Sequence, residues 1–152
     1  AWQSSDDSTK AISVSVRTLD SLSTEKRIGP ARLIVTDLEG EEVNFLHGAR
    51  QYIGEHRPYL LMEAAPPLLK LRGQSIDGFY AFLFGLHYEV FGLTRFGLAW
   101  IGDPQNIPDR QNWFCVPREH NGIEDKVRRI LLRCGLAPLV LNLNPLKLRG
   151  LS

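Results

Sequence analysis

The chain has 152 residues, of which 43% are hydrophobic and 23% charged, and its formal net charge is +1 at pH 7. This composition is that of an ordinary globular domain, and the small net charge argues against a general nucleic-acid binder, which is usually strongly basic. No apolar run reaches the roughly 18–20 residues that cross a bilayer, and the polar, acidic start does not resemble a signal peptide. We therefore expect a cytoplasmic protein without a transmembrane segment.

The first predicted element is a short strand. Residues 1–10 are polar, and from Ile12 to Val16 apolar and polar side chains alternate, which is the signature of a half-buried strand. Asp20 follows in a polar segment and is most simply a turn or cap residue, with a ligand role as the alternative. Gly29-Pro30 then interrupts the chain before the next element.

A second strand is predicted in the segment 32–38. Its apolar run 33–35 has no helical period, as expected for a strand buried on both faces, and it ends in Asp37, Glu39 and Gly40. Ligands of open α/β sheets bind beyond the carboxyl ends of the strands, so these two carboxylates are candidates for chemistry. The equally weighted alternative is that one of them caps the following helix, because acidic groups favour helix N-termini.

The next two elements repeat this pattern. Apolar residues recur at helical spacing from Glu41 to about Gly54, which predicts an amphipathic helix. The apolar run 59–62 then predicts a second buried strand, which again ends in a carboxylate, Glu63. Pro66-Pro67 is expected to break the chain before a short helical turn.

The rest of the chain alternates between helical patterns, strand-like runs and loops. A helix is predicted from Ser75, its N-cap, to Leu86, and strands are predicted at 88–91 and 112–116. Between the two strands, 94–110 is expected to be a loop with at most one short strand. The last predicted helix runs from Asn121 to Gly135 and has a capping-box-like start. Residues 136–152 have no clean period. The order predicts an α/β protein with parallel central strands and an antiparallel end.

Cysteines and histidines point to no metal centre. Cys115 and Cys134 both lie in apolar patterns and are expected to be buried free thiols, with a disulfide between them left open. No pair of the four histidines has the spacing of a metal-binding motif, so we expect no metal. His47 follows the carboxylates of the second strand by less than two helical turns and could face them.

Several separated pieces of the sequence resemble one methyltransferase family. They are Thr-Leu-Asp at 18–20, Leu-Ile-Val-Thr-Asp-Leu-Glu-Gly-Glu-Glu at 33–42, Leu46 with Gly48-Ala49, Arg57-Pro58 and Glu63. In this order they resemble the C-terminal half of an FkbM-type S-adenosylmethionine-dependent methyltransferase, whose core usually reads isoleucine-lysine-isoleucine-aspartate-valine-glutamate-glycine. Val35 stands at the position of the family's lysine. The resemblance extends over residues 14 to 116.

The resemblance implies both a fold and a reaction. The fold is the C-terminal portion of a Rossmann-like class I methyltransferase sheet, with segments 32–38 and 59–63 as its fourth and fifth strands and an antiparallel final strand pair. The reaction is methyl transfer from S-adenosyl-L-methionine to a hydroxyl group of a sugar or another natural product. Asp37 and Glu39 become the catalytic candidates, Asp37 also a donor-binding candidate, and Glu63 and His47 candidates for binding the small-molecule acceptor.

The family's glycine-rich donor loop has no counterpart in this sequence. We therefore expect residues 1–120 to form the C-terminal part of the domain and 121–152 a helix and a basic tail, with an N-terminal half missing from the chain or a homo-oligomer completing the site. The alternative is a non-catalytic remnant that acts as a binding or assembly module, because an incomplete sheet exposes edges and apolar faces. A membrane-surface or nucleic-acid contact through the basic tail ranks last.

Overall fold

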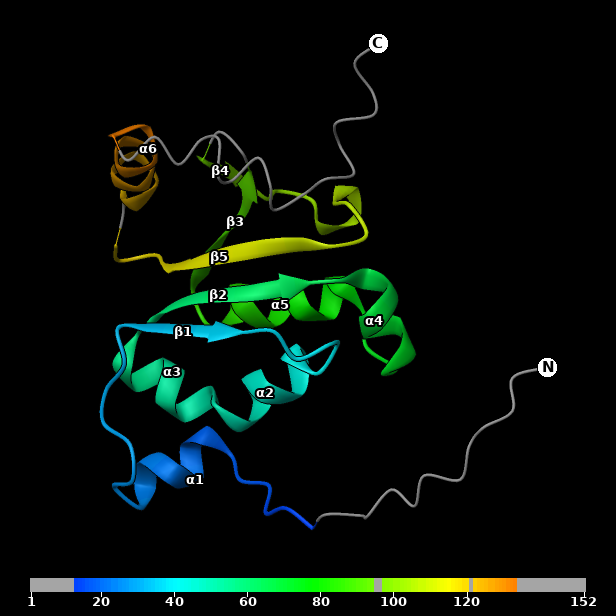
Figure 1. Cartoon of the computed structure of the whole chain (residues 1–152), viewed down its shortest axis with the longest axis vertical. Coiled ribbons are helices and arrows are strands. Elements are labelled where there is room, and N and C mark those ends of the chain that lie inside the picture. Colours follow the sequence, from blue (N-terminus) through cyan, green and yellow to red (C-terminus); the bar gives the residue numbers. More distant parts are fainter. Residues whose placement is uncertain (1–12, 95–96, 121, 134–152) are drawn as a thin grey trace, which may run out of the picture.

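A mixed five-stranded sheet, in the order β1-β2-β5-β3-β4, forms the centre of the computed structural model, which describes residues 13–94, 97–120 and 122–133 (Figure 1). The strands are β1 (Leu33–Thr36), β2 (Tyr59–Ala64), β3 (Tyr88–Thr94), β4 (Gly97–Trp100) and β5 (Gln111–Pro117). β1 and β2 are parallel, whereas β5 pairs antiparallel with both β2 and β3, and β3 with β4. The predicted α/β class and the antiparallel pairing of the last two predicted strands are confirmed.

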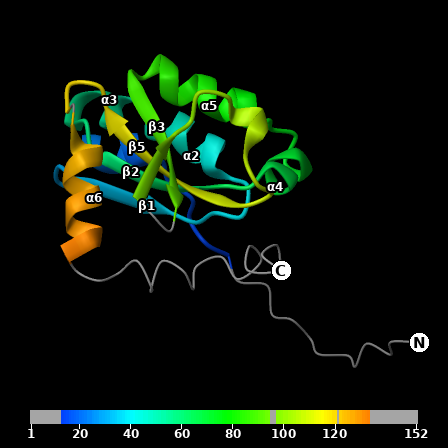
Figure 2. The same ribbon diagram turned by 90° about the horizontal axis from the view of Figure 1, so that it is seen from above.

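Helices lie on both sides of this sheet. They are α1 (Leu19–Thr24), α2 (Glu42–Gly48), α3 (Arg50–His56), α4 (Pro66–Leu71), α5 (Ile76–Gly85) and α6 (Ile123–Arg133), with a 3-10 turn η1 (Pro104–Asn106). Figure 2 shows α2, α3 and α5 on one side of the sheet and α6 on the other. α6 packs beside β4. None of the described helices is long and apolar enough to span a membrane.

The hydrophobic core lies between the sheet and α2, α3 and α5. Strand side chains alternate between the two faces of a sheet, and the core face is fully buried at Leu60, Met62, Trp113, Cys115, Leu46, Ile53, Phe79 and Leu83. Burial of one such aliphatic or aromatic side chain stabilises the fold by roughly 1.5–3 kcal/mol. The Cys115 thiol is free and buried, as the sequence predicts, whereas Cys134 lies outside the described residues.

β1 is not buried on both faces, which corrects the sequence-based expectation. Leu33 and Val35 are 49% and 64% exposed. β1 lies at one edge of the sheet, and no described element covers the face to which these two side chains point. The short apolar run therefore reports a strand that is covered on one side only.

The N-terminal segment also differs from the prediction. Residues 13–16 form no strand, and Val14 and Val16 are largely exposed. Alternation over so few residues does not make a strand by itself, and residues 13–16 pair with none of the described strands. Asp20, by contrast, is a cap: its carboxylate accepts hydrogen bonds of 3.1 and 2.8 Å from the backbone N–H groups of Gln51 and Tyr52, at the start of α3.

The predicted helix 41–54 is two helices. α2 and α3 meet at Ala49, a fully buried residue whose φ of −120° is not helical. The cap from Asp20 stabilises the new helix start. α3 continues past Gly54 to His56, and its C-cap Arg57 adopts a left-handed conformation with φ of 50°.

The remaining elements deviate less from the prediction. Pro66-Pro67 opens α4 rather than breaking the chain, because proline fits the first helical turn, where no N–H donor is needed. Ser75 is the N-cap of α5, as predicted, and its Oγ accepts a 3.0 Å hydrogen bond from the Gly78 N–H. The segment 94–110 contains β4 and η1. Asn121, where the last helix was predicted to begin, and residues 136–152 lie outside the described part of the chain.

Candidate functional site

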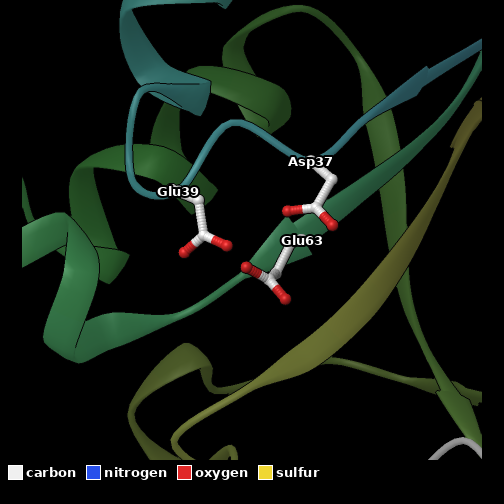
Figure 3. A group of neighbouring side chains, drawn as sticks. All are labelled: Asp37, Glu39 and Glu63. Carbon is white, nitrogen blue, oxygen red and sulfur yellow. The ribbon is translucent and has the colours of Figure 1, made fainter. Parts of the chain in front are cut away.

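Three carboxylates meet where the parallel strands β1 and β2 end. Asp37 follows β1 directly, Glu39 lies in the turn after it, and Glu63 is the last residue but one of β2. One oxygen atom of each carboxylate lies within 4.8 Å of the other two. Figure 3 shows the three side chains turned toward the same small space.

The sheet register brings the carboxylates together. Thr36 of β1 pairs with Met62 of β2, so the next residues along the parallel strands, Asp37 and Glu63, are neighbours. The side chain of Met62 is buried in the core, and alternation therefore directs Glu63 to the opposite face of the sheet. The carboxyl ends of parallel strands are the usual ligand-binding edge of such sheets.

Glu42 fixes the turn that presents Glu39. Its side chain is 1% exposed, and its carboxylate accepts hydrogen bonds from the N–H groups of Leu38 (2.8 Å) and Gly40 (3.1 Å). Glu39 adopts the left-handed conformation, with φ of 51°, which is costly for a residue with a side chain. Among the described residues no hydrogen bond from the start of α2 to Asp37 or Glu39 occurs, so the alternative that one of them caps this helix is not supported, and Glu42 instead holds the turn before it.

Arg110 is the fourth member of the site and was missed by sequence reasoning. Its guanidinium lies 3.2 Å from Glu63 Oε1 and 3.4 Å from Glu39 Oε2. Arg110 directly precedes β5, which runs antiparallel to β2 so that its beginning lies beside the end of β2. The only signal was this topology, because Arg110 stands in a loop 71 positions from Glu39 and belongs to no motif.

Glu63 is the electrostatically strained member of the group. Its residue is 6% exposed, and burial raises the pKa of its carboxyl group, an effect that Arg110 opposes and that Asp37, Glu39 and Glu42 reinforce. Glu63 Oε1 contacts Arg110, whereas the buried Oε2 finds no hydrogen-bond partner among the described residues. A buried carboxylate oxygen without a partner is costly in free energy.

His47 does not join the three carboxylates. It is an exposed residue near the end of α2, and its ring lies edge-on against Phe82 of α5, with 4.7 Å between the ring centres. The structure therefore gives His47 a packing contact, and the grouped candidates are Asp37, Glu39 and Glu63.

Comparison with known proteins identifies one family. The sequence model described as the methyltransferase FkbM domain matches residues 1–90. The match includes the three carboxylates of the site and stops before Arg110. No curated protein and no solved structure was found to match the chain.

Proposed function

The chain belongs to the FkbM methyltransferase domain family, and from this premise we propose that it transfers a methyl group from S-adenosylmethionine to a hydroxyl group of a sugar or another natural product. The observation that carries the proposal is the meeting of Asp37, Glu39 and Glu63 at the carboxyl ends of β1 and β2. We further propose that β1 and β2 correspond to the fourth and fifth strands of a Rossmann-like methyltransferase sheet, which the parallel pairing and the antiparallel end support.

The charge of the site is complementary to that of the methyl donor. When bound, S-adenosylmethionine supplies an electrophilic methyl group on a positively charged sulfur, and the carboxylate of Asp37 can attract such a cation. The backbone N–H groups of Leu38 and Gly40 cannot bind an anionic group of a ligand, because both already donate hydrogen bonds to Glu42. A glycine-rich donor loop is not found within 13–94, 97–120 or 122–133.

The carboxylates also fit the acceptor. A hydroxyl group that attacks an electrophilic methyl group must lose its proton, and it must be held in line with the bond that breaks. Asp37 and Glu39 are exposed, so either can accept a hydrogen bond from the hydroxyl group and take up its proton. Glu63 is buried and paired with Arg110, which suits it to positioning rather than proton transfer.

The test is a calorimetric titration of the full chain with S-adenosylhomocysteine, with the oligomeric state measured in the same buffer. Micromolar binding supports a donor site. The Asp37→Asn comparison uses S-adenosylmethionine, because only the donor carries the sulfonium charge that Asp37 is proposed to attract, and binding of the donor should weaken in this variant. In any active form of the protein, Asp37→Asn and Glu39→Gln should lower turnover strongly. Their effect on folding stability, measured as the free energy of unfolding, should be smaller.

The matched control is Glu55→Gln, which removes an exposed carboxylate of α3. If Asp37→Asn, Glu39→Gln and this control all turn over as the parent does, the assigned roles are wrong. No binding of S-adenosylhomocysteine at any concentration tested would favour the alternative of a binding or assembly module, which the exposed face of β1 supports.

A further inference from the structure

We propose that Asp37, Glu39 and Glu63 form the binding site of one divalent metal ion that prefers oxygen ligands, such as Mn²⁺, Mg²⁺ or Ca²⁺. No feature of the sequence suggested a metal, because the ligands come from two strand ends and contain no histidine or cysteine. The site arises only when the parallel pairing of β1 and β2 places the carboxylates side by side.

The spacing of the carboxylates suits a shared ion. Their nearest oxygen atoms all lie within 4.8 Å of one another. Two oxygen ligands on opposite sides of one ion are about 4.8 Å apart around Ca²⁺ and about 4 Å apart around Mg²⁺, given typical metal–oxygen distances. One oxygen from each side chain can therefore contact the same ion after small side-chain movements. Oxygen-only ligation selects hard cations over zinc or copper.

An independent observation comes from Glu63. Its carboxyl group is more than nine-tenths buried and faces the same space as the other two in Figure 3, yet its Oε2 has no hydrogen-bond partner in the described part of the chain. Buried carboxylates are normally paired or coordinate a metal, because leaving an ionised oxygen without a partner is costly. A metal ion in the group supplies that missing partner.

Charge balance gives the same result. Within the described residues the three carboxylates are accompanied by one guanidinium, that of Arg110, which contacts two of them, so the ionised group carries two excess negative charges. One divalent cation cancels this excess. Arg110 is 56% exposed at the side chain and reaches in from a loop, so it can move outward when an ion binds. It therefore competes with the ion for Glu39 and Glu63.

The role of the ion in the reaction rests on the proposed function. Beside a bound hydroxyl acceptor, a divalent cation holds the oxygen and makes its proton easier to remove. Binding of the ion itself needs no methyl donor, because it depends on the three carboxylates alone.

The experiment measures Mn²⁺ binding to the full chain by electron paramagnetic resonance, which reports free Mn²⁺, after removal of metals with a chelator. We expect one ion per chain, competed by Mg²⁺ or Ca²⁺. Glu63→Gln and Asp37→Asn should each weaken binding at least tenfold. Arg110→Met should strengthen it severalfold, because the competing charge is gone. Circular dichroism establishes that each variant is folded.

The control is again Glu55→Gln, which should bind Mn²⁺ as the parent does. Equal binding by the parent, Glu63→Gln and Asp37→Asn would overturn the proposal and show an adventitious ion only. Binding by Arg110→Met without binding by the parent would also overturn it, because Arg110 would then be the natural partner of the carboxylates. Since no donor is present, failure of the S-adenosylhomocysteine titration leaves these results unaffected, and a failed Mn²⁺ titration leaves the donor site standing.

Discussion

The charged side chains at the two ends of β2 differ in how completely they are paired. At its amino end, Arg57 precedes the strand, and all three nitrogen atoms of its guanidinium group donate hydrogen bonds. At its carboxyl end, Glu63 lies among other carboxylates with one oxygen unpaired within the described residues. The strand between them contributes the same kind of buried apolar side chains throughout, so the ends differ in the partners that the neighbouring elements provide.

At the amino end, Arg57 joins three parts of the chain. Its guanidinium donates hydrogen bonds to the Leu86 carbonyl (2.7 Å), the His87 carbonyl (3.1 Å) and the Glu119 carboxylate (2.6 and 3.0 Å), and it lies 4.7 Å from the centre of the Tyr88 ring. These bonds link the end of α3, the turn before β3 and the segment after β5. The Arg-Pro pair that contributed to the family resemblance therefore has a structural role.

The pKa values of the two ends shift in opposite directions. The hydrogen bond from Arg57 lowers the pKa of Glu119 to about 2, whereas burial raises the pKa of Glu63. A lowered pKa means that folding favours the ionised carboxylate, and a raised pKa means that folding opposes it. The amino end thus contributes stability, while the carboxyl end gives stability up, as functional sites commonly do.

The largest effect should follow from removing the arginine at the stable end. Arg57→Met keeps most of the aliphatic chain but deletes the charge-assisted hydrogen bonds. We therefore expect the free energy of unfolding to fall by about 2–4 kcal/mol. Urea denaturation measures the change. Arg27→Met, at an exposed arginine with one 4.0 Å ion pair, is the control and should change stability by less than about 0.5 kcal/mol. A similar loss in both variants would contradict the comparison.

A second variant tests the turn at the other end of β2. Gly40 has a φ of 96°, and a Cβ atom there would lie 2.7 Å from the Leu68 carbonyl oxygen. Gly40→Ala should therefore destabilise the protein by about 1–3 kcal/mol and weaken Mn²⁺ binding through displacement of Glu39. Gly73→Ala isolates the backbone cost, because Gly73 has a φ of 70° but open space around its Cβ position. If Gly73→Ala costs as much in urea denaturation, the contact with Leu68 is irrelevant.

A third variant should stabilise the protein. Glu63→Gln removes a buried charge and keeps the shape of the side chain, and Arg110 retains Glu39 as a partner. In metal-free buffer at neutral pH we expect a gain of about 0.5–1.5 kcal/mol in the free energy of unfolding, measured by thermal and urea denaturation. A loss of stability would mean that the carboxyl end of β2 is satisfied as it stands, and the contrast between the ends would fail.

The smallest effect is a pH dependence at the amino end. The folded-state pKa of Glu119 is below its ordinary value of 4.5, so its stabilising contribution is fully present above about pH 4.5 and is lost as the pH falls toward 2. Because Glu119 is exposed, solvent screening limits the contribution to about 1 kcal/mol or less. Glu119→Gln should be less stable than the parent at pH 6, and the gap should narrow by pH 3. A gap that stays constant would exclude the ion pair as its cause.

The sequence predicted the elements better than their surroundings. The apolar runs at β1, β2, β3 and β5 located strands because runs and turn signals are local properties. The prediction that β1 is buried on both faces was wrong, because the exposure of a strand depends on which elements lie next to it. The break at Ala49 was missed because the cap that begins α3 comes from Asp20, about 30 positions earlier in the chain.

The site was predictable to the same degree. Asp37, Glu39 and Glu63 could be selected because each ends or follows a predicted strand, and parallel pairing implied a common edge. Their grouping with Arg110 could not be predicted, because it needs the antiparallel insertion of β5 beside β2. The holding role of Glu42 was equally hidden, since a glutamate in the first turn of a helix is ordinarily explained by the helix dipole.

The position of Arg110 has a consequence for how such a protein can diversify. The family match stops at residue 90, so the arginine that touches two motif carboxylates is supplied from beyond it. A substitution in the loop before β5 can therefore change the cation affinity of the proposed site while every motif residue stays in place. Two chains with identical motifs can differ in cation affinity, and exchanging this loop between them is a route to redesign that leaves the sheet intact.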